Sequence, residues 1–328
     1  MNRKCIGCGA ELQSINKDEL GYVPKDKLKD AKYCERCFKI KNYNLKTVTN
    51  LENINNYILE EINKKANYVY FMLDILNINE ETIKTFKSIK KDKCLVISKL
   101  DIIPKSIKCK TISEWLKEVY GITERIIYQS SNKNINTSEI TNSIKNTKNK
   151  EAYLVGYTNS GKSTLINTLL EGKDKLTTSN NLNTTIDFIK IKLDDFTIID
   201  SPGFTYENTF YNKEEFSLIK NTNPKKFLKP ITYQTKDITN LIIEKRLSIK
   251  TSVPNSVTCY FSNDINIDRV FDNEEKKLLN SKTIEYKIED NTDLVIKSLG
   301  FINIKKTCTL KISTELKELI EIRKSMFK

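Results

Sequence analysis

The sequence predicts an α/β domain that is preceded by a small cysteine module and followed by a β-rich domain. Two Cys-x-x-Cys pairs lie near the amino terminus, and in the middle of the chain short apolar runs end in polar, glycine-containing motifs. Beyond residue 208, apolar and polar side chains alternate with the period of strands. We therefore expect domains at residues 1–45, 46–208 and 209–328.

Length, composition and charge bound the class of protein. The chain has 328 residues, of which 38% are apolar and 30% charged, which suits a soluble globular protein. No apolar run reaches the ~20 residues of a membrane-spanning helix, and no signal segment is visible, so we expect a cytoplasmic protein without membrane contact. The net charge of +13 suggests RNA binding, but only six of the 55 basic residues are arginine, and an AT-rich genome also produces many lysines.

The amino-terminal cysteines have the spacing of a tetrahedral thiolate site. Cys5 and Cys8 form one pair and Cys34 and Cys37 the other. Because the sequence contains no histidine, a closed site must consist of cysteine alone, which favours structural Zn²⁺. Two disulfides or a redox motif are the alternatives, but cytosolic thiols stay reduced, and redox motifs do not normally occur as two matched pairs.

A phosphate-binding loop lies at residues 156–163, which match the pattern G-x-x-x-x-G-K-S in full. A strand is predicted at 152–155 and a helix at 164–170, which is the context that the motif requires. Lys162 is expected to neutralise the β and γ phosphates of a nucleoside triphosphate, and Ser163 to ligate Mg²⁺. The residues expected to contact the nucleotide here are Gly156, Asn159, Ser160, Gly161, Lys162, Ser163 and Thr164.

A second element on the magnesium side follows a strand predicted at 196–199. Asp200 is expected to hold the metal through water, and the amide of Gly203 to contact the γ-phosphate. Between the two motifs, Thr185 is the expected switch threonine for Mg²⁺, with Thr184 as the alternate. The residues expected to act in hydrolysis are Lys162, Thr185, Asp200, Gly203 and Asn159.

A base-recognition motif precedes the phosphate-binding loop. A strand predicted at 93–97 ends in Ser98-Lys99-Leu100-Asp101, which resembles the sequence N-K-x-D. The Asp101 carboxylate can accept from N1–H and the exocyclic amine of guanine, whereas adenine lacks this donor pair, so an ATP-using enzyme is the weaker alternative. Lys99 is expected to lie over the base. A strand at 125–128 leads to Ser130 and Ser131, where a backbone loop would contact guanine O6.

The motifs therefore run in permuted order, because standard GTPases place the phosphate-binding loop first and the base-recognition loops last. Chain ends normally lie at the surface, so a sheet survives their joining and reopening. A strand predicted at 68–73 takes the place of the one that ordinarily follows the Asp-x-x-Gly loop.

The chain resembles the YqeH family of circularly permuted GTPases over nearly its whole length. The resemblance is carried by the cysteine pairs, the permuted motifs, and the stretches K-P-I-T-Y-Q at 229–234 and S-L-G-F at 298–301. It implies GTP hydrolysis used as a switch, a role in assembling the small (30S) ribosomal subunit, and binding to its 16S rRNA. The rival hypothesis is a zinc-containing RNA-binding module that binds GTP with little or no hydrolysis.

Several positions depart from the family pattern or modify it. Ser98 replaces the usual Asn, which predicts weaker hydrogen bonds from the base loop to guanine and to the phosphate-binding loop. Leu182 and Asn183 stand where the family has Pro-Gly. Asn159 matches the position that holds K⁺ beside the phosphates in related GTPases, and Phe204 stands where many GTPases carry a glutamine that orients water.

The carboxy-terminal third is predicted to be mostly β, with strands near 246–250, 257–261 and 283–288 and a closing helix at 314–327. By analogy with the family it binds RNA or protein; the alternative is that it only completes the fold. Residues 204–220 follow the γ-phosphate-sensing loop directly. We expect them to form a linker that GTP orders or releases, against the alternative of a rigid interface.

Overall fold

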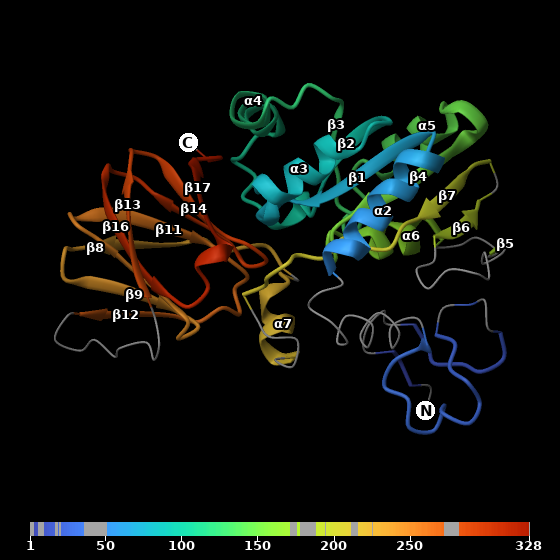
Figure 1. The fold of residues 1–328 in the computed structure, drawn as a ribbon, viewed down its shortest axis with the longest axis horizontal. Helices are drawn as coiled ribbons and strands as arrows, with labels where there is room; N and C mark the ends of the chain where they lie inside the picture. Colours follow the sequence, from blue (N-terminus) through green and yellow to red (C-terminus); the bar gives the residue numbers. More distant parts are fainter. Residues whose placement is uncertain are drawn as a thin grey trace. The chain divides into compact units, whose positions relative to one another are not determined.

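The protein is described by a computed structural model of residues 1–328, shown in Figure 1. The described residues are 3–5, 10–16, 19, 21–35, 51–170, 176–177, 188–193, 195–210, 216–224, 226–271 and 282–327. The chain divides into two compact units. The first comprises Met1–Met72, Lys87–Ser98 and Gln129–Glu207, and the second Leu73–Phe86, Lys99–Tyr128 and Asn208–Lys328.

A seven-stranded sheet has the strand order β3-β2-β1-β4-β7-β6-β5. Its strands are β1 (Tyr68–Asp74), β2 (Asp92–Ser98), β3 (Ile126–Tyr128), β4 (Glu151–Gly156), β5 (Leu176–Thr177), β6 (Ile189–Lys192) and β7 (Thr197–Asp200). β4 pairs in parallel with β1 and β7, whereas β6 runs antiparallel to β7. The strand order reverses between β1 and β4, and such a switch point opens a binding crevice at the carboxyl ends of the two strands.

The strands form where the sequence places continuous apolar runs. Residues 69–74 of β1 and 152–156 of β4 are all buried, which is typical of parallel strands covered on both faces. The five strands predicted from the sequence in this part of the chain are confirmed, with ends that differ by one residue at most sites. β2, which ends at Ser98, precedes β4, which leads into the phosphate-binding loop. This is the permuted chain order expected from the motifs.

The α-helices of the described residues are α2 (Leu51–Lys65), α3 (Glu80–Ser88), α4 (Cys109–Tyr120), α5 (Thr137–Lys145), α6 (Lys162–Leu170) and α7 (Phe216–Thr222). Local sequence explains their ends. At the start of α3, the Asn79 side chain accepts from Thr82 N at 3.0 Å while the Thr82 hydroxyl accepts from Asn79 N at 3.1 Å, a reciprocal cap. Gly121 ends α4 in the left-handed conformation. None of the described helices is long and apolar enough to cross a membrane.

The β-rich part consists of two five-stranded antiparallel sheets, coloured orange to red in Figure 1, with the orders β12-β9-β10-β16-β13 and β17-β14-β15-β11-β8. The strands are β8 (Ile231–Thr235), β9 (Thr239–Ile243), β10 (Leu247–Thr251), β11 (Asn255–Tyr260), β12 (Ile267–Phe271), β13 (Lys282–Ile288), β14 (Thr292–Ile296), β15 (Gly300–Ile304), β16 (Cys308–Thr314) and β17 (Ile320–Lys324). Both sheets contribute to one apolar core, in which Ile243, Leu310 and Ile302 are fully buried. The predicted β content is confirmed.

The helix predicted at 314–327 is wrong. The chain instead makes a short 3-10 turn at Lys317–Leu319 and then β17, which pairs antiparallel with β14. Tertiary pairing overrides helix propensity here, because Arg323 reaches the buried Asp293 carboxylate of β14 at 3.4 Å. The Arg323 guanidinium also lies 4.8 Å from the Trp115 ring centroid.

Candidate functional site

The loop between β4 and α6 has the backbone of a phosphate cradle. Gly156 has φ +153°, and a Cβ added there would lie 2.3 Å from the carbonyl oxygen of Met72, so a side chain does not fit. Gly161 has φ +95° and Asn159 φ 64°. Left-handed positions of this kind occur in loops whose N–H groups bind anions before the amino terminus of a helix.

Lys162 lies inside this loop. Its side chain is buried, and Nζ donates to the carbonyl oxygens of Gly156 at 2.8 Å and Tyr157 at 3.2 Å. Ser160 is buried as well, and its hydroxyl has no hydrogen-bond partner among the described residues. A buried unpartnered hydroxyl is costly, so the loop retains unused hydrogen-bonding capacity at its centre.

The Asp200-to-Gly203 loop packs against the phosphate-binding loop. Asp200 ends β7 and is buried, and Ser201 N donates to Leu154 O at 3.0 Å. A Cβ added at Gly203 would lie only 3.3 Å from Lys162 Nζ. The two motifs that the sequence assigned to phosphate and magnesium chemistry therefore adjoin.

Phe204 anchors the far side of this loop. Its N–H donates to Gly156 O at 3.1 Å, and its carbonyl accepts from Thr158 N at 2.8 Å. The ring is buried against Tyr157, with the centroids 5.7 Å apart. Thr205 N donates to the Asn55 side chain at 3.1 Å. The first residues of the segment predicted as a nucleotide-dependent linker are therefore bonded within the first unit in this structure, and their release by nucleotide stays a prediction.

Ser98 ties the end of β2 to the phosphate-binding loop. It is buried, and its hydroxyl donates to the carbonyl oxygen of Ser160 at 2.7 Å. Serine in place of asparagine thus keeps one hydrogen bond to this loop, and the weaker hydrogen bonding expected from the sequence stays a prediction. The shorter side chain reaches because β2 and the loop approach closely: a Cβ added at Gly161 would lie 3.7 Å from the Ser98 Cβ.

Ser130 and Ser131 lie in a tight loop after β3. Gln129 N donates to Ile97 O at 2.8 Å, which continues the sheet next to β2. Ser130 is fully buried and exchanges two backbone hydrogen bonds with Ile135, at 3.2 and 2.8 Å. Ser131 Oγ accepts from the Gln129 side chain at 2.7 Å. The first unit therefore brings this loop and Ser98 to adjacent strand ends.

Lys99 and Asp101 follow Ser98 in the chain and belong to the second unit. Lys99 adopts a left-handed conformation with φ 60°, which begins the short 3-10 turn Leu100–Ile102. Its ammonium group donates to Asp74 Oδ2 at 2.7 Å and to Asn223 Oδ1 at 2.8 Å. Asp101 is half-buried in the turn. Sequence reasoning did not identify Asp74 or Asn223; the only local signal was an aspartate at the end of a buried strand.

The remaining predicted residues are exposed, are buried in the amino-terminal module, or lie outside the described part. Asn159, Ser163 and Thr164 are exposed. The switch positions Leu182, Asn183, Thr184 and Thr185 lie outside the described residues, as do Cys8 and Cys37. Cys5 and Cys34 are both buried, and the Cys34 amide donates to Cys5 Sγ at 3.2 Å. Within the described ranges, no group of three or more acidic, cysteine or histidine side chains could hold a metal ion.

Comparison with known proteins gives the relationship of the chain. Residues 151–255 match the family described as 50S ribosome-binding GTPase. The chain is 32% identical over 284 residues to the uncharacterized protein YqeH of Bacillus subtilis (strain 168). The matched region covers 81% of this chain and 77% of that protein. It is 30% identical over 221 residues to GTPase Der of Karelsulcia muelleri (strain GWSS), covering 63% of this chain but only 45% of that protein.

Among solved structures, YjeQ from Thermotoga maritima is similar to 44% of this chain and 50% of that chain, with a TM-score of 0.33 and 19% identity. That likeness is too distant to argue from. The identity to the Bacillus subtilis protein extends over most of both chains, and the matched GTPase family begins at β4, the strand that carries the phosphate-binding loop. The chain is a GTPase and belongs to the YqeH family of circularly permuted GTPases.

Proposed function

We propose that this GTPase acts as a switch in the assembly of the small ribosomal subunit and binds its 16S rRNA in the cytoplasm. The observation that supports a switch most directly is the packing of the Asp200-to-Gly203 loop on Lys162. A loop in contact with the phosphate-neutralising lysine can respond to the presence of the γ-phosphate.

We assign the phosphate side of the nucleotide to the loop before α6. The N–H groups at Gly156, Asn159, Ser160 and Gly161 would bind phosphate oxygens, and Lys162 would exchange its carbonyl partners for the β and γ phosphates. Ser163 and Thr185 would ligate Mg²⁺ and Asp200 would hold it through water, while Thr164 would contact the nucleotide. The bound Mg²⁺ would supply positive charge to the developing phosphates. The exposed hydroxyl of Ser163 and the buried carboxylate of Asp200 provide the hard oxygen donors that Mg²⁺ prefers.

We assign guanine recognition to Lys99 and Asp101, with the loop of Ser130 and Ser131 contacting guanine O6. Within the second unit, Lys99 is held by Asp74 and Asn223. Fixed donors and acceptors discriminate strongly, because the wrong base leaves them unpaired. Phe204 cannot orient water, so we expect slow turnover without a partner, with K⁺ held near Asn159 as the cationic aid.

We further propose that Cys5, Cys8, Cys34 and Cys37 bind structural Zn²⁺. The bond from the Cys34 amide to Cys5 Sγ supports this, because thiolates in such sites accept backbone N–H groups that orient them. Metal analysis of the purified protein should find one zinc per chain. Cys34→Ser should lose it, whereas Cys109→Ser, at an isolated cysteine, should keep it; equal zinc content in both variants would refute the assignment.

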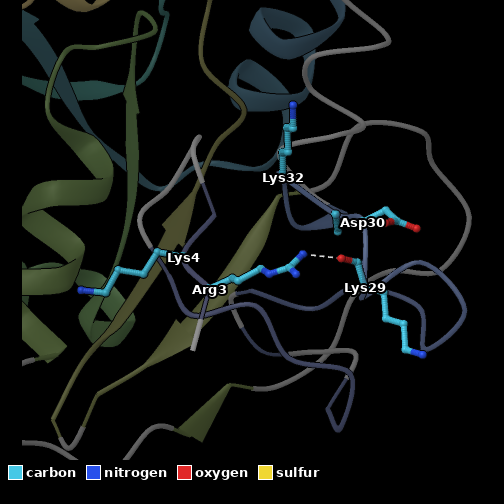
Figure 2. Close-up of a pocket in the computed structure, with 6 residues that line it drawn as sticks. Arg3, Lys4, Lys29, Asp30 and Lys32 are labelled. Atoms are coloured by element: carbon cyan, nitrogen blue, oxygen red, sulfur yellow. Dashed lines mark hydrogen bonds between the residues drawn. The ribbon is translucent and has the colours of Figure 1, made fainter. Parts of the chain in front are cut away.

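The amino-terminal module also presents exposed basic side chains. Arg3, Lys4, Lys29 and Lys32, with Asp30, line an open pocket of about 510 Å³, shown in Figure 2. Arg3 donates to the carbonyl oxygen of Lys29, which fixes one side of the pocket. Cations on a small module can neutralise RNA phosphates. This supports the ribosomal partner without identifying the binding site on it.

Co-sedimentation with isolated 30S and 50S subunits, in GTP, GDP or a non-hydrolysable analogue, tests the proposal. We expect nucleotide-dependent binding to 30S. Preferential binding to 50S subunits would overturn the small-subunit assignment and would agree instead with the description of the matched family, 50S ribosome-binding GTPase. Lys4→Glu/Lys32→Glu should weaken binding, whereas Lys105→Glu/Lys108→Glu, with the same charge change at exposed lysines elsewhere, should not.

A further inference from the structure

The Lys99 side chain is held by two acceptors that are distant in the sequence. Its ammonium group bonds to Asp74, which ends β1, and to Asn223, which directly follows α7. Lys99 and Asp74 retain only 15% and 7% side-chain exposure. A charged hydrogen bond shielded to this extent is stronger than one at the surface. All three residues belong to the second unit.

The chain around Asn223 contacts the 99–102 turn at a second point. Leu228 is fully buried, and its N–H donates to the carbonyl oxygen of Ile102 at 2.8 Å. Asn223 and Leu228 therefore bind the turn at its first and last residues, on either side of Asp101. A short segment that bonds to both ends of a turn restricts its backbone and the direction of Lys99.

The same segment is attached to the β-rich sheets. Lys229 N donates to the Asn263 side chain at 2.8 Å, and Asn263 Nδ2 donates to Phe227 O at 2.9 Å. Asn263 lies between β11 and β12, and β8 begins two residues after Lys229. Residues that lead into the carboxy-terminal sheets therefore also hold the turn that carries Lys99 and Asp101.

We propose that Asn223 is a positioning residue for guanine binding, supplied in cis by the segment that leads into the carboxy-terminal sheets. Its amide oxygen gives the Lys99 ammonium group a second acceptor beside the Asp74 carboxylate. The two acceptors together hold the aliphatic part of the Lys99 side chain in the orientation in which it would lie over the base. Asp74 alone constrains one N–H direction, which leaves the ammonium group free to rotate about the remaining bond. This inference rests on the proposed guanine-binding role of Lys99.

Fluorescent GDP and GTP titrations, with dissociation rates, test the inference. Asn223→Ala and Asn223→Leu should each weaken both nucleotides by the same factor, about 3- to 10-fold, through faster dissociation. The factor should be equal because Lys99 acts on the base rather than on the γ-phosphate. Asn223→Asp, which keeps an acceptor oxygen, should restore most of the affinity. Asn221→Ala, the same change two residues earlier, should bind like the parent.

A double-mutant comparison separates positioning from a structural effect. In a Lys99→Met background, Asn223→Ala should change affinity less than twofold, because the group that it positions is absent. Parent-like affinity in Asn223→Ala and Asn223→Leu would overturn the inference. So would a loss of affinity from Asn223→Ala that is as large in the Lys99→Met background as in the parent. Failure of the parent itself to prefer GDP over ADP would instead refute the proposed base recognition.

Discussion

Removal of the Ser98 hydroxyl should loosen the phosphate-binding loop. Ser98→Ala deletes the 2.7 Å bond to the Ser160 carbonyl, and both residues are almost inaccessible, with 1% and 2% exposure. Water cannot easily replace the lost donor. A buried carbonyl left without its donor costs about 1–3 kcal/mol, whereas an average hydrogen bond contributes about 1 kcal/mol. We expect a loss of about 1–2 kcal/mol in the free energy of unfolding of the first unit.

The hydrogen bond already exists without nucleotide. Its loss should therefore lower the stability of the first unit, whereas its effect on nucleotide affinity should be indirect. Urea denaturation followed by far-UV circular dichroism should report the change in stability. GDP affinity should fall by no more than about tenfold, since only the fraction of molecules with a displaced loop is affected. Ser98→Thr, which keeps the hydroxyl, should restore both quantities.

Ser160→Ala is the matched control, because it removes a hydroxyl that has no partner among the described residues and leaves the Ser160 carbonyl in place. Deleting an unpartnered buried hydroxyl should be neutral or slightly stabilising without nucleotide. If Ser98→Ala proves as stable as Ser160→Ala, the bond does not hold the loop and the reasoning fails.

Three further predictions follow from the geometry. Asp101→Asn should weaken GTP and improve xanthosine triphosphate, because an amide donor suits the ring carbonyl of xanthine; retained GTP preference in competition binding would contradict the role of Asp101. Hydrolysis should be faster in K⁺ than in Na⁺, and Asn159→Ala should abolish the difference, so equal parent rates in the two salts would argue against K⁺. Asp293→Ala should destabilise the second unit by about 3–5 kcal/mol in urea denaturation, because Arg323 is left as an unpaired buried charge, whereas the exposed Asp290→Ala should have little effect.

The sequence predicted those parts of the fold that local chemistry determines. Apolar runs identified β1, β2 and β4 because strands buried on both faces need continuous hydrophobicity. Glycines identified the cradle, since Gly156 and Gly161 adopt backbone conformations that other residues avoid. The order of motifs along the chain then predicted the permuted sheet.

Contacts between distant residues were beyond sequence reasoning. Lys99 and Asn223 are separated by 124 positions, and no pattern in either segment indicates the other. The last strand was mistaken for a helix because residues 314–327 contain good helix formers, and only pairing with β14 decides between the two. The switch threonines and two cysteines lie outside the described residues, so those assignments stay predictions.

The anchoring of Phe204 changes where nucleotide-dependent motion can begin. In an unpermuted GTPase the Asp-x-x-Gly loop is tethered on both sides; here the Phe204 bonds to Gly156 and Thr158 supply the second tether although the chain leaves the sheet. In the second unit, Phe210 is fully buried and its N–H donates to the Ser298 hydroxyl at 2.9 Å. Tyr206 is buried and its ring stacks on Tyr157 with the centroids 4.5 Å apart, so only residues 207–209 lie between it and the second anchor.

Any segment released by loss of the γ-phosphate should therefore start after Tyr206. Hydrogen exchange should show the Phe204 and Thr205 amides protected with both GDP and a non-hydrolysable GTP analogue, and nucleotide-dependent exchange only at 207–209 and beyond. Phe204→Ala should remove the protection at Thr158 in both states, since a truncated buried phenylalanine leaves a cavity costing about 3–5 kcal/mol. Phe204→Leu should largely keep it. Rapid exchange at Phe204 with GDP but not with the analogue would show that the second tether is broken in each cycle, and that the transmitting segment begins at the γ-phosphate-sensing loop itself.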